Sequence, residues 1–199
     1  MTLPADLAAS RQLVKYIKEK VTDLVEVIDE FPNANCDLEF PSCSVTTVGT
    51  PKYTNEMPTP LRYEVDPDEP LNDLELTIIG SYDAKYQVDI WAQSKIQRSR
   101  LLESVIDSLN IDFMEKDLPC GLSLKLEEYH DIIARYDQVG YTYIDGEDSS
   151  QKDQWRVKLD LIVNYPKVAV RSIARINEIT ITSDIAIDDK LDIEENFTI

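Results

Sequence analysis

The sequence is short of basic residues, glycine, cysteine and histidine. Its 199 residues contain 20 Lys and Arg against 38 Asp and Glu, a formal net charge of −18, together with 5 Gly, 3 Cys and 1 His. Affinity for nucleic acid comes largely from the counterions that Lys and Arg displace, so tight binding of duplex DNA is not expected. Because the acids are spread along the whole chain, identical subunits would repel one another unless apolar contacts or matched charges offset the repulsion.

The scarce residue types also exclude most catalytic templates. The five glycines form neither a G-x-G-x-x-G nor a P-loop pattern, and no G-x-S-x-G motif occurs. A single histidine, His130, excludes a two-histidine metal site and leaves a Ser-His-Asp triad unsupported. Cys36, Cys43 and Cys120 show no C-x-x-C spacing, and Cys120 is expected to be a small buried hydrophobe rather than a nucleophile paired with His130. We therefore expect no enzyme activity, no metal and no cofactor.

Acidic groups in polar stretches are the remaining candidates for a cation site, because hard cations prefer oxygen ligands. None of them has the spacing of a calcium-binding loop, and solvated loop acids are the preferred interpretation. The groups are Asp66/Asp68/Glu69, Asp145/Glu147/Asp148 and Asp188/Asp189.

Long apolar runs are absent as well. No window of about 18 apolar residues occurs, and the first residues have neither the basic start nor the apolar segment of a signal peptide. We expect no membrane association and no export.

Two helices are predicted by their apolar period. From Pro4 to Glu30, apolar residues follow a spacing of three and four, which indicates one long amphipathic helix ended by Pro32. A second helix is expected from Ser94 through Phe113, with Gln97 completing a capping box.

Between these helices, residues 31–73 differ in kind, because they hold seven of the ten prolines. We expect one short strand near residues 43–48 inside an extended, acidic arm that packs on a neighbouring subunit. Its predicted partner-binding residues are Tyr53, Tyr63, Asp66, Asp68 and Glu69.

Alternating apolar residues predict strands in the rest of the chain. They occur at 74–78, 86–91, 122–126, 132–136, 139–144, 155–165 and 177–182, with a polar hairpin loop at 145–153. The first two stretches form either two strands or one bent strand. The predicted fold class is α+β, a mostly antiparallel sheet with a long N-terminal helix and a second helix packed on one face. We expect a single domain over residues 1–183 and an acidic C-terminal extension over 184–199.

Basic residues gather only around the junction of the 86–91 strand with the second helix and at the start of the 155–165 strand. We expect this region to form a subunit contact, with basic side chains meeting an acidic neighbour. The predicted interface residues are Asp89, Trp91, Lys95, Arg98, Arg100, Arg156 and Lys158.

Two stretches carry a family resemblance. Tyr86-Gln87-Val88-Asp89-Ile90-Trp91-Ala92-Gln93-Ser94-Lys95, running into the helix, resembles the Q-x-V-D-[IV]-[WY] strand of tail and neck terminator proteins of tailed bacteriophages. Gln154-Trp155-Arg156-Val157-Lys158-Leu159-Asp160-Leu161 and the later Ile176-Asn177-Glu178-Ile179-Thr180-Ile181 resemble the W-x-x-[RK]-x-x-[LV]-x-[LV] strand and the closing strand of that family. Residues 31–73 and the tail after Asp184 have no counterpart in the pattern.

The resemblance implies a structural virion protein that forms a ring, often of six copies, at the head-proximal end of the tail. Such a ring terminates the tail tube or sheath and joins it to the neck or connector, and it is assembled in the host cytoplasm. An acidic lumen would let DNA pass without binding it. Two alternatives stay open: another tail assembly subunit, of the tube or baseplate, and an enzyme with a carboxylate-bound metal.

Overall fold

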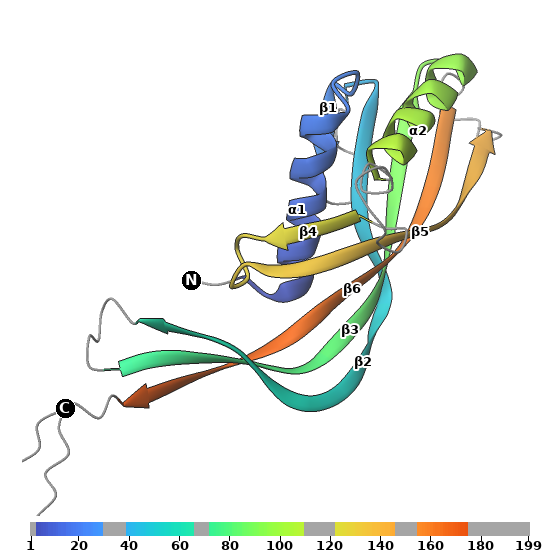
Figure 1. The fold of residues 1–199 in the computed structure, drawn as a ribbon. Coiled ribbons are helices and arrows are strands. Elements are labelled where there is room, and N and C mark those ends of the chain that lie inside the picture. Colours follow the sequence, from blue (N-terminus) through green and yellow to red (C-terminus); the bar gives the residue numbers. More distant parts are fainter. Residues whose placement is uncertain (1–2, 30–38, 66–71, 110–121, 146–154, 175–199) are drawn as a thin grey trace, which may run out of the picture. The chain divides into compact units, whose positions relative to one another are not determined.

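A computed structural model describes residues 3–29, 39–65, 72–109, 122–145 and 155–174 of the chain (Figure 1). Over these residues the strands form one sheet in the order β1-β2-β3-β6-β5-β4. The elements are α1 (Ala5–Lys20), β1 (Glu26–Ile28), β2 (Ser42–Val65), β3 (Asn72–Ala92), α2 (Lys95–Leu109), β4 (Leu122–Leu126), β5 (Ile132–Asp145) and β6 (Trp155–Ala174).

The predicted fold class is wrong in its sheet and in its first helix. The sheet is mixed, because β1 runs parallel to β2, whereas β4 with β5 and β5 with β6 are antiparallel. Helix α1 has 16 residues and ends at Lys20, ten residues before the predicted end. The apolar residues 24–28 satisfy the helical period, but Val25, Val27 and Ile28 are β-branched and also suit a strand. Pairing decides between the two: β1 aligns with Ser42–Ser44 of β2, and the Val25 N–H donates to the Pro41 carbonyl at 2.8 Å.

The chain divides into two compact units that are linked by β2, β3 and β6. The first comprises Met1–Met57 and Ile79–Lys167 and holds both helices, β1, β4 and β5. The second comprises Pro58–Ile78 and Val168–Ile199, and its described residues all belong to the three linking strands.

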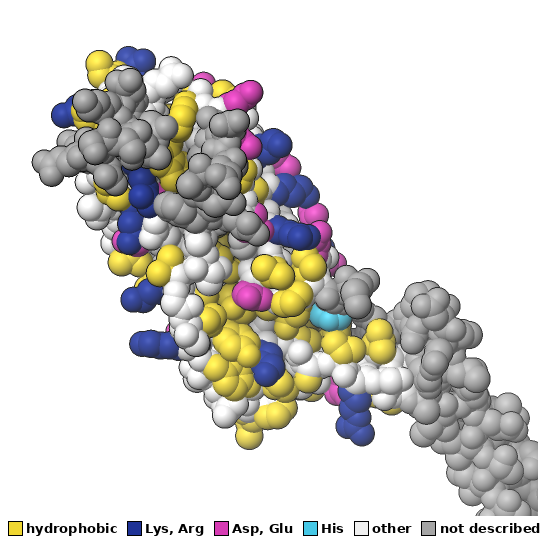
Figure 2. Space-filling view, turned by 180° about the vertical axis from the view of Figure 1, so that it is seen from behind, with side chains coloured by type: hydrophobic (Ala, Val, Ile, Leu, Met, Phe, Trp, Pro, Cys, Tyr) yellow, Lys and Arg dark blue, Asp and Glu magenta, His cyan; other side chains and the backbone are white. Residues whose placement is uncertain are grey.

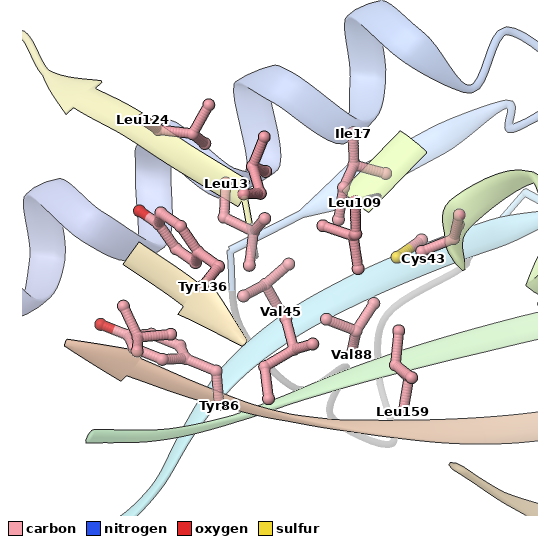
Figure 3. Packing of buried hydrophobic residues seen from close by; sticks show 14 of the residues in the cluster. Leu13, Ile17, Cys43, Val45, Tyr86, Val88, Leu109, Leu124, Tyr136 and Leu159 are labelled. Atoms are coloured by element: carbon pink, nitrogen blue, oxygen red, sulfur yellow. The ribbon is translucent and has the colours of Figure 1, made fainter. Parts of the chain in front are cut away.

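The first unit has one apolar core between the helices and the sheet (Figure 3). Leu13 and Ile17 of α1 and Val105 of α2 are fully buried against Val88 of β3 and Leu159 of β6. Both helices therefore cover the same face of the sheet. That face takes every second residue of β3 and of β6, as expected for a strand covered on one side.

Helix α2 begins where the capping pattern predicts. The Gln97 N–H donates to Ser94 Oγ at 3.2 Å, and Gln97 Oε1 accepts from the Gln93 N–H at 2.9 Å. The first bond satisfies a backbone donor that the first turn leaves without a helical partner, and the second pairs the N–H of the residue before the cap.

Two strands are much longer than expected. Strand β2 has 24 residues rather than the short strand predicted near 43–48, and β6 continues through Pro166 to Ala174. Proline lacks a backbone donor and is tolerated on a strand edge, and β2 beyond Ser44 has such an edge among the described residues. The stretches at 74–78 and 86–91 are parts of one strand, β3.

Strand β5 joins the two predicted runs 132–136 and 139–144 through a bulge at Val139. Gln138 pairs with Leu161 and Gly140 with Asp160, which leaves Val139 as the extra residue. The bulge changes the alternation, so that Tyr136 before it and Tyr141 after it lie on the same face of the sheet.

The predicted loop at 145–153, the strand at 177–182 and the extension at 184–199 lie outside the described residues, apart from Asp145 at the end of β5.

Candidate functional site

The ends of β3 and β5 and the starts of α2 and β6 meet in a group of charged and aromatic side chains. We call this group the junction cluster: Gln87, Asp89, Trp91, Lys95, Arg98, Tyr143, Trp155 and Arg156. On β3 the core face takes Val88 and Ile90, so Gln87, Asp89 and Trp91 lie on the face away from the helices. Arg156 lies on that same outer face of β6, because its neighbour Val157 is in the core.

Asp89 and Arg156 form a buried ion pair on the outer face. Asp89 has no exposed surface, and Oδ1 accepts from Arg156 Nη2 at 2.7 Å and from Nε at 2.8 Å. Its other oxygen, Oδ2, accepts from Gln87 Nε2 at 2.6 Å. Both carboxylate oxygens thus have partners, which a buried charge requires. The Arg156 guanidinium also lies 5.5 Å from the centre of the Trp91 ring.

Two more cations contact aromatic rings on the helix side. The guanidinium carbon of Arg98 lies 4.2 Å from the centre of the Tyr143 ring, and Lys95 Nζ lies 4.6 Å from that of Trp155. Arg98 is 5% exposed and donates from Nη1 to the Arg156 carbonyl at 3.2 Å, which links α2 to β6 through the sheet backbone. Cation and ring contacts of this kind are favourable, more so when the cation is shielded from water.

The structure brings five of the seven predicted interface residues into this cluster: Asp89, Trp91, Lys95, Arg98 and Arg156. Of the other two, Arg100 is exposed on α2, and Lys158 pairs with Asp160 two residues along its own strand at 3.2 Å. Asp89 and Arg98 are buried within the chain, so substitution of either is expected to affect folding first. A contact with another subunit stays a prediction, and Lys95 and Arg100 are its exposed members.

Tyr143, Trp155 and Gln87 belong to the cluster but were not among the predicted site residues. The strand pattern contained a signal for Gln87, because it precedes Asp89 by two residues and therefore shares its face. Tyr143 had no such signal, since its face depends on the bulge at Val139.

The predicted partner-binding arm is described only in part. Tyr53 packs within the first unit, with its ring centre 4.9 Å from that of Tyr82, which in turn lies 5.5 Å from that of Tyr165. Lys167 Nζ lies 5.0 Å from the centre of the Tyr53 ring. Tyr63 belongs to β2, while Asp66, Asp68 and Glu69 lie outside the described residues, so binding of a partner by the arm stays a prediction.

Charge is unevenly divided between the described residues and the rest of the chain. The described residues hold 20 of the 38 acids and 16 of the 20 bases, so their net charge is −4 and the remaining −14 lies outside them. Figure 2 shows Lys and Arg side chains scattered among hydrophobic ones on one face, without a block of a single sign. Most of the excess negative charge therefore belongs to the stretches that flank or connect the described elements.

No group of three or more His, Cys, Asp and Glu side chains placed to hold a metal ion occurs in the described ranges. The acidic groups named from the sequence fall outside those ranges, except Asp145. Cys43 is buried in the core, and burial raises the pKa of its thiol.

No described helix has the length and apolar character needed to cross a membrane.

Comparisons with known proteins do not identify a family for this chain. No protein-family model matches this chain, and no curated protein matches it. A chain of the solved structure described as "Virion of native gene transfer agent (GTA) particle" is similar to it, with 10% sequence identity and a TM-score of 0.43, over 82% of this chain and 100% of that one. This is a weak likeness to a virion component, and no ring, position in a particle or stoichiometry follows from it.

Proposed function

We propose that this chain is a structural subunit of a phage-like virion, assembled as a ring at the head-proximal end of the tail. In this role it ends the tail tube or sheath, contacts the neck or connector, and surrounds the passing DNA without binding it specifically. The proposed ring has six copies, because that is the ring size implied by the family resemblance of the two sequence motifs. It assigns no catalytic role to the chain.

One observation carries the proposal: residues of both motifs meet in the junction cluster. Asp89 and Trp91 come from the first motif, Trp155 and Arg156 from the second, and the Asp89–Arg156 ion pair at 2.7 Å joins them. Two strand patterns that are common separately are thus connected by specific contacts here. Arg156 stands at an unspecified position of the family pattern, so the ion pair connects the two stretches without matching a pair of family positions, and the step from a common fold to a role is an analogy.

The charge distribution supports the same role. A nearly neutral framework, with a net charge of −4 over the described residues, can pack against copies of itself more easily than a uniformly acidic one. The acidic stretches outside it would repel the DNA backbone wherever they face a lumen.

The test is electron microscopy of the purified protein together with its mass in solution. We expect closed rings with a pore wide enough for a DNA duplex, and a mass that is a fixed multiple of the chain. A chain that stays monomeric at all concentrations, even with tail-tube protein added, would contradict the proposal. Growth into long tubes without a cap would instead identify a tube subunit.

A further inference from the structure

Among the residues that the structure describes, the sheet of the first unit has an uncovered edge on each side. β1 covers β2 only at Ser42–Ser44, and β4 covers β5 only at Leu122–Leu126 opposite residues 132–136. Residues 45–56 of β2 and 137–145 of β5 therefore have no described strand on their outer side. A strand edge of this length presents a row of backbone donors and acceptors to a further strand.

The β5 edge lacks two of the usual protections against pairing, charge and proline, although it has the bulge at Val139. The stretch Gln138–Ile144 contains no charged residue and no proline, in a chain of which 29% is charged. Four of its apolar side chains are exposed: Val139 by 62%, Tyr141 by 50%, Tyr143 by 44% and Ile144 by 37%. Exposed strand edges normally carry charges or proline, because an uncharged, β-prone edge promotes association. This edge is therefore suited to be covered by another strand.

We propose that the β2 edge of a second copy covers the β5 edge, so that copies join head to tail. This proposal rests on the proposed ring and assigns its subunit contact. The two edges lie at opposite sides of one sheet, and the strands from β2 to β5 alternate in direction: β3 runs opposite to β2 and β6 in Figure 1, and β5 is antiparallel to β6. β2 and β5 consequently run in opposite directions, and a neighbouring copy in the same orientation would extend the antiparallel ladder. A head-to-tail contact of this kind closes into a ring when its rotation permits.

Charge favours β2 over a second β5 as the covering strand. Residues 137–145 contain two acids and no base, so pairing β5 with β5 would bring four carboxylates together. Residues 45–56 contain one base, Lys52, and one acid, Glu56, and add no net charge. Like charges on paired strands are destabilising. Pro51 removes one donor from the β2 edge, so we expect the new ladder on either side of it.

The first experiment places a charge on the open edge. We expect Val139→Lys and Tyr141→Lys each to abolish ring formation in sedimentation and electron microscopy, with the circular dichroism spectrum unchanged. Ile133→Lys is the matched control, because Ile133 is 63% exposed on the part of β5 that β4 already pairs. Rings formed equally well by the edge variants would overturn this contact and leave the proposed function standing, whereas a monomeric wild-type chain would remove both.

The second experiment separates the two modes of pairing by disulfide formation. In a Cys36→Ser/Cys120→Ser background, Thr50→Cys and Thr142→Cys place one thiol on each edge. We expect mixed oxidation to link the Thr50→Cys chain to the Thr142→Cys chain. A covalent dimer of the Thr142→Cys chain, with no disulfide between the two variants in the mixture, would show β5 paired with β5 and overturn the head-to-tail contact.

Discussion

Asp89 is a buried charge whose stability depends on two partners. Its carboxylate is fully enclosed, and its oxygens accept from Arg156 and Gln87 at 2.6 to 2.8 Å. The desolvation cost of such a pair offsets much of its attraction, so its presence is weak evidence for added stability. Removal of one partner, however, leaves the other charge buried without compensation.

We expect Asp89→Asn to destabilise the fold by about 3 kcal/mol, the lower end of what breaking a buried pair costs, because Arg156 is partly exposed. Urea unfolding followed by tryptophan fluorescence measures the change. The matched control is Asp137→Asn, since Asp137 pairs with Arg135 at 3.0 Å but both side chains are more than a third exposed. That variant should lose less than about 1 kcal/mol. Equal losses in the two variants would show that burial of the Asp89 pair has no special effect.

Gly80 is required by a close approach of two strands. A Cβ at this position would lie 2.5 Å from the Thr54 carbonyl oxygen and 2.6 Å from the Tyr53 ring. A glycine leaves room for another strand to approach closely, and here the Tyr53 ring also contacts Tyr82 in a tilted arrangement, with the ring centres 4.9 Å apart.

Replacement of Gly80 should therefore lower the free energy of unfolding more than replacement of another strand glycine. We expect Gly80→Ala to lower the free energy of unfolding by about 1 to 3 kcal/mol, because Thr54 would have to move its backbone. Gly140→Ala is the control, since nothing lies within 4 Å of the added Cβ there, and it should stay within about 0.5 kcal/mol of wild type. Thermal melting of both variants decides the comparison.

At the scale of elements, tyrosine hydroxyls fix helix α1 to its neighbours. Tyr86 of β3 donates to the Asp6 carbonyl and Tyr136 of β5 donates to the Ala9 carbonyl, each at 2.8 Å. Tyr16 of α1 in turn donates to the Ser108 carbonyl of α2 at 2.7 Å. These bonds occur at the border of the apolar core, where an unpaired hydroxyl or carbonyl would be costly.

The buried phenols make stability depend on alkaline pH. Burial raises the pKa of Tyr86 and of Tyr136 above the usual value of about 10. Above that value the unfolded chain loses these protons while the folded chain keeps them, so stability falls as pH rises, by about 1.4 kcal/mol per pH unit for each tyrosine. Chemical unfolding measured at intervals above pH 9 should show this slope.

Tyr136→Phe tests the assignment. At neutral pH the variant should be less stable by about 1 kcal/mol, because the bond to Ala9 is lost. The difference from wild type should shrink as pH rises, since phenylalanine does not ionise. A slope identical to that of wild type would mean that Tyr136 does not cause the pH dependence.

At the scale of the whole molecule, net charge opposes assembly of identical copies. The chain carries −18, of which −14 lies outside the described residues. Repulsion between exposed charges is screened by salt, with a Debye length of about 10 Å at 0.1 M ionic strength. Apolar contacts and backbone ladders are not weakened in the same way.

We therefore expect salt to promote ring formation. Sedimentation between about 0.05 M and about 0.5 M NaCl should show a shift from small species to rings. Asp66→Asn/Asp68→Asn/Glu69→Gln removes three negative charges from the arm and should lower the salt needed. Assembly that weakens with salt would indicate that opposite charges across the contact dominate instead.

The sequence predicted some elements correctly and others not, and the difference has physical reasons. β4 and the start of α2 are as predicted, since alternation and the Ser94–Gln97 cap are local patterns. The end of α1 and the length of β2 were wrong, because the period of residues 24–28 allows two structures and only pairing with Ser42–Ser44 selects the strand. Five of the seven predicted interface residues lie together, yet their mutual contacts within one chain could not be read from spacing.

The sequence by itself determined the acidic charge, the two faces of each regular strand and the start of α2. These properties depend on residue type and on spacing within a few positions of the chain. The tertiary structure alone decided that Asp89 pairs with Arg156, 67 residues away, that Val139 is a bulge, and that no described strand covers the outer edges of β2 beyond Ser44 and of β5 beyond Tyr136. Each of these depends on which distant strand lies alongside, and that choice is made by burial of the common core.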